Sequence, residues 1–71
     1  RKDYQRAIDY FDGALIGMPG NAMAYCRRGI SHYYEHNYEL ALQDLRRALE
    51  IDEDIPNIKT YMSMAKKKSG R

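Results

Sequence analysis

The chain has 71 residues, a net charge of +2 and one cysteine, Cys26. A chain of this length buries only about 60% of the surface that it exposes when unfolded, so we expect one small unit, and a lone cysteine excludes an internal disulfide. The small net charge gives no general affinity for nucleic acids or membranes, and no apolar run approaches the roughly 20 residues that span a bilayer.

The free thiol and the absence of an apolar export segment predict an intracellular, cytoplasmic protein. The sequence starts with RKDYQRAIDY and has no initiator Met, which suggests a piece of a longer chain. Its charges are unevenly placed: residues 39–54 hold six acids and two arginines, whereas residues 59–71 hold five basic residues and no acid. This asymmetry favours an orienting field over general adhesion to charged surfaces.

Apolar residues at the start of the chain recur at spacings of three and four, which predicts an amphipathic helix. Gly17, Pro19 and Gly20 end it. Asn21 suits the N-cap of a second helix, and the pair at 36–37, HN, predicts a tight turn after that helix. The apolar stripes of the two helices are Tyr4, Ala7, Ile8, Phe11, Ala14 and Leu15, and then Ala22, Tyr25, Cys26, Gly29, Ile30 and Tyr33.

A third helix repeats the spacing of the first from Tyr38, and the acidic run IDED at residues 51–54 ends it. Pro56 suits the first turn of a fourth helix, for which Asp54 is a candidate cap. Lysines crowd the last turn of that helix, where they complement the helix dipole, and Gly70 ends it. No segment alternates as a strand does, so the predicted fold class is all-α, with about four helices.

The sequence repeats itself with a period of 34 residues. A shift by 34 places the apolar stripe of the first helix on that of the third, and it places Gly29 on Ser63, both small. A period of 34 with paired helices is typical of the tetratricopeptide repeat. The chain resembles that family at six positions of its central block, the small and large contact residues Tyr25, Gly29, Tyr38, Ala41, Leu45 and Ala48.

The resemblance implies antiparallel helix-turn-helix repeats, a fragment of an α-solenoid, in a single unit over residues 1–71. Residues 22–55 correspond to a complete repeat, and residues 3–21 to helix B of a preceding one. Residues 56–70 correspond either to helix A of a next repeat or to a C-terminal capping helix. The chain departs from the family at Arg28, where Leu is usual, at His32, where Tyr is usual, and at Glu53, where a second Pro is usual.

The resemblance further implies a scaffold that binds another protein or peptide in a groove lined by the A helices. Arg27 is the first candidate, because YCRRG at residues 25–29 is similar to the third repeat of co-chaperones that clamp an acidic chaperone C-terminal tail. A planar guanidinium suits a carboxylate. The family's partner lysine is Met23 here. The groove positions carried over are Arg27, Ile30, Tyr33, Tyr34, Tyr61, Met64, Lys67 and Lys68.

Two other interpretations stay open. Arg27 and Arg28 are also explained as solvated, ion-paired surface residues. The chain is also explained as a structural segment of a longer helical array, in which the exposed face of the first helix binds upstream repeats or a second copy.

The string HYYEH at residues 32–36 matches a zinc-protease pattern, H-x-x-E-H. A zinc enzyme would need a third protein ligand and an open coordination position, whereas the repeat already explains this segment. We therefore expect His32 to pack in place of a Tyr and His36 to lie in the turn. Cys26 lacks an orienting acid and an oxyanion hole, so we expect a small buried residue. We expect no enzyme activity, no metal and no cofactor.

Overall fold

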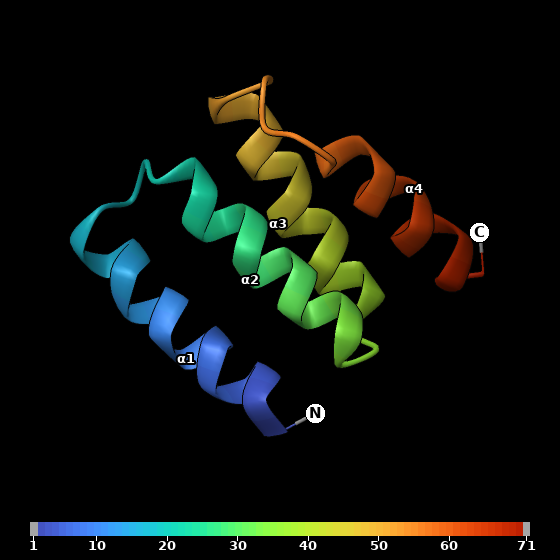
Figure 1. The fold of residues 1–71 in the computed structure, drawn as a ribbon, viewed down its shortest axis with the longest axis horizontal. Helices are drawn as coiled ribbons and strands as arrows, with labels where there is room; N and C mark the ends of the chain where they lie inside the picture. The colour runs from blue at the N-terminus through green and yellow to red at the C-terminus, as the bar shows by residue number, and fades with distance from the viewer. Residues whose placement is uncertain (1, 71) are drawn as a thin grey trace.

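The structure is a computed structural model that describes residues 2–70, and every regular element in that range is a helix. The helices are α1 (Lys2–Gly17), α2 (Ala22–Tyr34), α3 (Tyr38–Ile51) and α4 (Ile58–Lys68). They follow one another across the molecule from α1 at one edge to α4 at the other, each reversing the direction of the one before (Figure 1). The predicted all-α class is confirmed.

Local sequence explains the first two connections. Asn21 caps α2 as predicted, because its side-chain oxygen accepts a hydrogen bond of 3.1 Å from the backbone N–H of Ala24. The predicted turn between α2 and α3 is present, and His36 takes a left-handed backbone with φ 68°. Asn37 then donates its backbone N–H to the carbonyl of His32 at 2.8 Å, which satisfies one of the last acceptors of α2.

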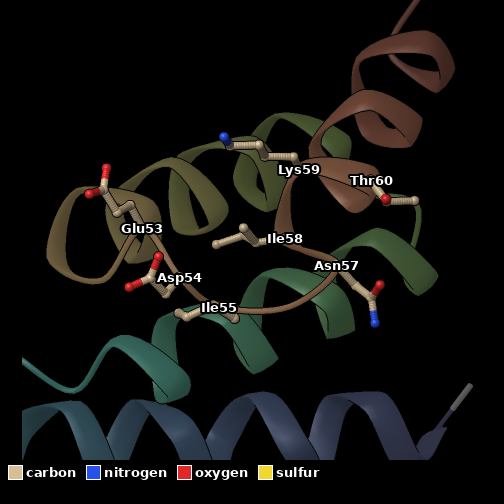
Figure 2. Close-up of a pocket in the computed structure, with 7 residues that line it drawn as sticks. All are labelled: Glu53, Asp54, Ile55, Asn57, Ile58, Lys59 and Thr60. Atoms are coloured by element: carbon tan, nitrogen blue, oxygen red, sulfur yellow. The ribbon is translucent and has the colours of Figure 1, made fainter.

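The start of α4 differs from the prediction. The helix begins at Ile58, so Pro56 precedes it, and the N-cap is Asn57 in a left-handed conformation rather than Asp54. Ile55 and Ile58 are 6% and 2% exposed, and both lie between α2 and α3 (Figure 2). Burying these two side chains fixes where the chain turns, which outweighs the proline's preference for a first helical turn.

The core depends on the close approach of α2 and α3. Gly29 faces α3, and Ala41, Leu45 and Ala48 on that helix are 0% exposed. Tyr25 packs against the cluster that contains Leu45 and Ala48. Small residues on both helices let the backbones come together, and the large side chain of Leu45 fills the remaining space. These positions are the ones at which the sequence resembles the family.

Arg28 connects three helices. Its Nε and Nη2 each donate a hydrogen bond of 2.8 Å to the carboxylate of Asp44 on α3, and its Nη1 donates one of 2.7 Å to Asp12 on α1. The hydrogen bonds to Asp44 raise the pKa of Arg28 above its ordinary value, against the opposing effect of burial. The place of the family's leucine is therefore taken by a side chain that contributes ion pairs as well as a packed stem.

The thiol of Cys26 lies inside this core, 4% exposed, and burial raises its pKa. Because the thiolate is the reactive form, we expect labelling by a water-soluble disulfide reagent at pH 8 to be at least about tenfold slower than for an unfolded cysteine. The rate should rise to that of a free thiol in guanidinium chloride, because labelling then needs no opening of the fold. Fast labelling without denaturant would contradict the buried placement.

Candidate functional site

Arg27 lies on α2 beside α1, between two shallow hollows. One, of about 360 Å³, is shared by Arg27 and Ile30 with Tyr4 and Phe11 of α1. The other, of about 190 Å³, is lined by Arg27 together with Phe11 and Met23. We call this surface the Arg27 groove. An extended chain that crosses α2 here would meet an exposed guanidinium with apolar surface on both sides.

A row of tyrosines continues the surface from α1 to α4. The ring of Tyr34 stacks on Tyr4, with centroids 5.2 Å apart, and its hydroxyl lies 3.4 Å from that of Tyr61. This hydrogen bond is the main cause that raises the pKa of Tyr34. Tyr33 is only 8% exposed and packs edge-on against both Tyr34 and Tyr61. The buried ring of Tyr33 therefore packs beneath the exposed row.

The remaining predicted positions lie on α4. Met64 is half-buried and packs against the cluster of Tyr33, Ala41 and Ala65. Lys67 and Lys68 are exposed in the last turn of the helix. The structure thus brings Arg27 and Ile30 together in one hollow, and it brings Tyr34 and Tyr61 together in the tyrosine row. Lys67 and Lys68 are exposed at the end of α4.

The two histidines of the HYYEH string have different surroundings. His32 is inside α2, and its Nε2 lies 3.7 Å from the carboxylate of Asp44, while its buried Nδ1 has no hydrogen-bond partner among the described residues. His36 lies after the end of α2, and its Nδ1 is 2.7 Å from the hydroxyl of Tyr38. Within residues 2–70, no three His, Cys, Asp or Glu side chains gather to hold a metal ion.

The contribution of α1 to the groove was missed, because the sequence assigned that helix a purely structural role. Tyr4 and Phe11 belong to its apolar stripe, and their spacing alone does not distinguish a buried core residue from a residue that lines a groove. The role of Arg28 did leave a signal. Asp12 and Asp44 each lie 16 residues from Arg28, one before and one after it. Acids at equal distances before and after an arginine are the available signal, because α1 and α3 both lie beside α2 and run opposite to it (Figure 1).

Consecutive antiparallel helices that pack side by side, with a glycine at the close contact between α2 and α3, define a helical-repeat module. Residues 22–55 match the family model for the tetratricopeptide repeat. This segment is therefore a tetratricopeptide repeat. The assignment of residues 3–21 and 56–70 to neighbouring half-repeats stays a prediction.

Three curated proteins resemble the chain over 51 residues. Over 51 residues the chain is 39% identical to serine/threonine-protein phosphatase 5 of Mus musculus and 37% identical to the protein of that name in Homo sapiens. It is 35% identical to small glutamine-rich tetratricopeptide repeat-containing protein 2 of Saccharomyces cerevisiae. The match covers 72% of this chain but only 10% to 15% of those proteins.

The tetratricopeptide repeat is a protein-interaction fold, and the chain is a module of that type. Among the residues that the structure describes, no helix is both long enough and apolar enough to cross a membrane.

Proposed function

We propose that the chain binds a peptide segment of another protein in the Arg27 groove, with an acidic group of the peptide on Arg27. The resemblance to co-chaperone repeats suggests a C-terminal carboxylate as that group and an acidic chaperone tail as its source. The observation that carries this proposal is the contrast between two adjacent arginines, only one of which is engaged within the fold.

Arg28 makes ion pairs to both of its neighbouring helices, whereas Arg27 is exposed and has no ion-pair partner among the described residues. An arginine that is free to use its planar fork can hold a carboxylate through two parallel hydrogen bonds. The hollows on either side of Arg27 have apolar walls, which suit the side chains of a bound peptide. The open guanidinium and the apolar walls together favour an acidic peptide over a purely apolar one.

The tyrosine row suits the rest of such a peptide. Tyr4, Tyr34 and Tyr61 each present an aromatic body with a polar hydroxyl, the combination that is enriched at protein interfaces. Their ring stacking and hydroxyl contact hold the row in place before a ligand arrives. Less conformational freedom is then lost on binding, which favours affinity.

The test is a titration of the labelled chain with a synthetic acidic peptide that has a free C-terminal carboxylate, followed by NMR. We expect Arg27→Ala to weaken binding about tenfold, the effect of losing roughly 1.5 kcal/mol in a charge-assisted hydrogen bond. Helicity should not change, because the side chain is exposed. Arg27→Lys should fall between the two, since it keeps the charge and loses the fork.

A matched ligand and a matched variant sharpen this test. The same peptide with an amidated C-terminus should bind as weakly to the unmodified chain as the acid form binds to the Arg27→Ala variant. Asp3 lines the same hollow as Arg27, so Asp3→Ser should tighten binding of the acidic peptide by removing a like charge. The proposal fails if the titration shifts no resonances around Arg27 and Tyr34.

A further inference from the structure

Five of the seven tyrosine rings of this chain touch one another within the described residues. A phenol is oxidised by the loss of one electron and one proton, and two phenoxyl radicals that meet couple through their ring carbons. The cluster therefore has a chemistry that peptide binding does not use. Its members come from all four helices and are Tyr4, Tyr33, Tyr34, Tyr38 and Tyr61.

In one pair of this cluster the hydroxyl ends of the rings meet. The hydroxyl oxygens of Tyr34 on α2 and Tyr61 on α4 lie 3.4 Å apart, and the ring centroids lie 6.4 Å apart. In a dityrosine the new bond joins the carbons next to the hydroxyl-bearing carbons, so the two hydroxyls of the product face each other across it. The pair therefore resembles the product at its reacting ends. Tyr34 is 40% exposed, so its ring has room to pivot.

The other rings that touch Tyr34 are placed less well for coupling. Tyr33 is 8% exposed and is held edge-on between Tyr34 and Tyr61, so close packing resists a turn of its ring. Tyr4 is the remaining competitor, because its ring stacks on Tyr34 with the planes 18° apart. That stack brings the ring faces together, whereas the contact with Tyr61 brings the hydroxyl ends together. We therefore expect Tyr61 to be the partner.

We propose that Tyr34 and Tyr61 form an oxidative cross-link that joins α2 to α4. A one-electron oxidant, the activated haem of a peroxidase, removes one electron and one proton from each phenol. The two radicals form a bond between their ortho carbons, and the hydrogen on each of these carbons then moves to the phenol oxygen. The two electrons and two protons reduce one hydrogen peroxide to two water molecules. The reaction needs no bound peptide, so it goes beyond the proposed function and does not depend on it.

The contact within the fold makes this reaction intramolecular. Groups that one chain holds together meet at an effective concentration of at least about 1 mM, far above a low micromolar concentration of separate chains. The cross-link closes a loop between residues 27 positions apart. Closing such a loop restricts the unfolded chain, which raises the stability of the fold. The cross-link also holds the exposed tyrosine row in its present arrangement.

The test treats the 71-residue chain, at low micromolar concentration, with a haem peroxidase and hydrogen peroxide. The blue fluorescence of dityrosine should appear while the chain stays a monomer on a denaturing gel. Trypsin then separates the candidate tyrosines, because Tyr34 lies in peptide 29–46, Tyr61 in peptide 60–66 and Tyr4 in peptide 3–6. We expect mass spectrometry to find peptides 29–46 and 60–66 joined, at a mass two hydrogen atoms below their sum.

Phenylalanine variants identify the two partners, because phenylalanine keeps the ring and has no phenolic hydrogen to lose. Tyr34→Phe and Tyr61→Phe should each lower the yield of the joined peptides at least about tenfold, since the pair in contact is then lost. The matched control is Tyr10→Phe, which removes a tyrosine that is 72% exposed on α1. It should leave the yield within about twofold, because the site is distant. After oxidation, the midpoint of thermal unfolding should be at least about 5 °C higher in the unsubstituted chain than in Tyr34→Phe.

Several results would overturn the proposal. Peptide 29–46 joined to peptide 3–6 in place of 60–66 would make Tyr4 the partner. Joined peptides 29–46 and 60–66 that persist in Tyr34→Phe would place the bond on Tyr33 or Tyr38. Mainly dimers on the gel, or no joined peptides at all, would mean that the contact in the fold does not direct the oxidation. None of these results bears on peptide binding at Arg27.

Discussion

Replacing Gly29 with leucine is expected to unfold the chain. A Cβ at this position would already lie 3.0 Å from the Cγ of Leu45 and 3.1 Å from the backbone carbonyl oxygen of Ala41. Neither partner can move away, because Leu45 and Ala41 are both 0% exposed. Overpacking of a core costs about 1 to 3 kcal/mol, and more when backbone must shift. A chain of this length has only roughly 4 to 10 kcal/mol of stability in total.

Thermal and urea unfolding followed by circular dichroism measures this effect, and Gly13 provides the matched control. Gly13 lies in the interior of α1, and a Cβ there meets nothing within 4 Å. Gly13→Ala should therefore raise the free energy of unfolding by about 0.5 to 1 kcal/mol, through helix propensity alone. Gly29→Ala should lower it in spite of the same propensity gain. If both alanine variants were more stable, the close approach of α2 and α3 would be wrong.

Asp44→Ala is expected to have a comparably large effect, a loss of about 3 to 5 kcal/mol. Asp44 is 6% exposed, and it accepts two hydrogen bonds from Arg28. Without Asp44, Arg28 keeps only its ion pair with Asp12. The guanidinium charge then stays between three helices with most of its compensating negative charge removed. The expected result is a chain that is largely unfolded at 37 °C, as measured by the same unfolding curves.

Two comparisons separate this charge effect from simple loss of packing. Asp12→Ala should cost no more than about 1 kcal/mol, because the side chain of Asp12 is 51% exposed and water screens its pair. The double change Arg28→Leu with Asp44→Ala should be less harmful than Asp44→Ala alone, since no buried charge is left unpaired. A double variant that is less stable than Asp44→Ala would show that packing of the arginine stem dominates.

Where the chain turns could be predicted only in part. Asn21 was identified correctly because an N-cap depends on a side chain and an N–H three residues apart. The start of α4 was placed too early, because the burial of Ile55 and Ile58 decides it, and burial depends on helices distant in the sequence. Local rules therefore located the elements, and tertiary packing set this boundary.

The Arg27 groove, too, could be predicted from the sequence only in part. Arg27, Ile30, Tyr34 and Tyr61 were proposed from family positions, and the structure adds Tyr4 of α1, whose stacking on Tyr34 joins residues 30 positions apart. A helical stripe shows which residues share a face, but it does not show how much of that face a neighbour covers. Tyr33 and Tyr34 illustrate this, since adjacent tyrosines end at 8% and 40% exposure.

By itself, the sequence determined the all-α class, the period of 34 and the small residues at which α2 and α3 meet, because a regular spacing needs only the geometry of one helix. Only the tertiary structure decided the role of Arg28, which replaces a usual leucine and binds Asp12 and Asp44 across three helices. It also decided that Arg27 stays unpaired among the described residues. Ion pairing depends on distances between side chains of different helices, and such distances exist only once the helices have packed.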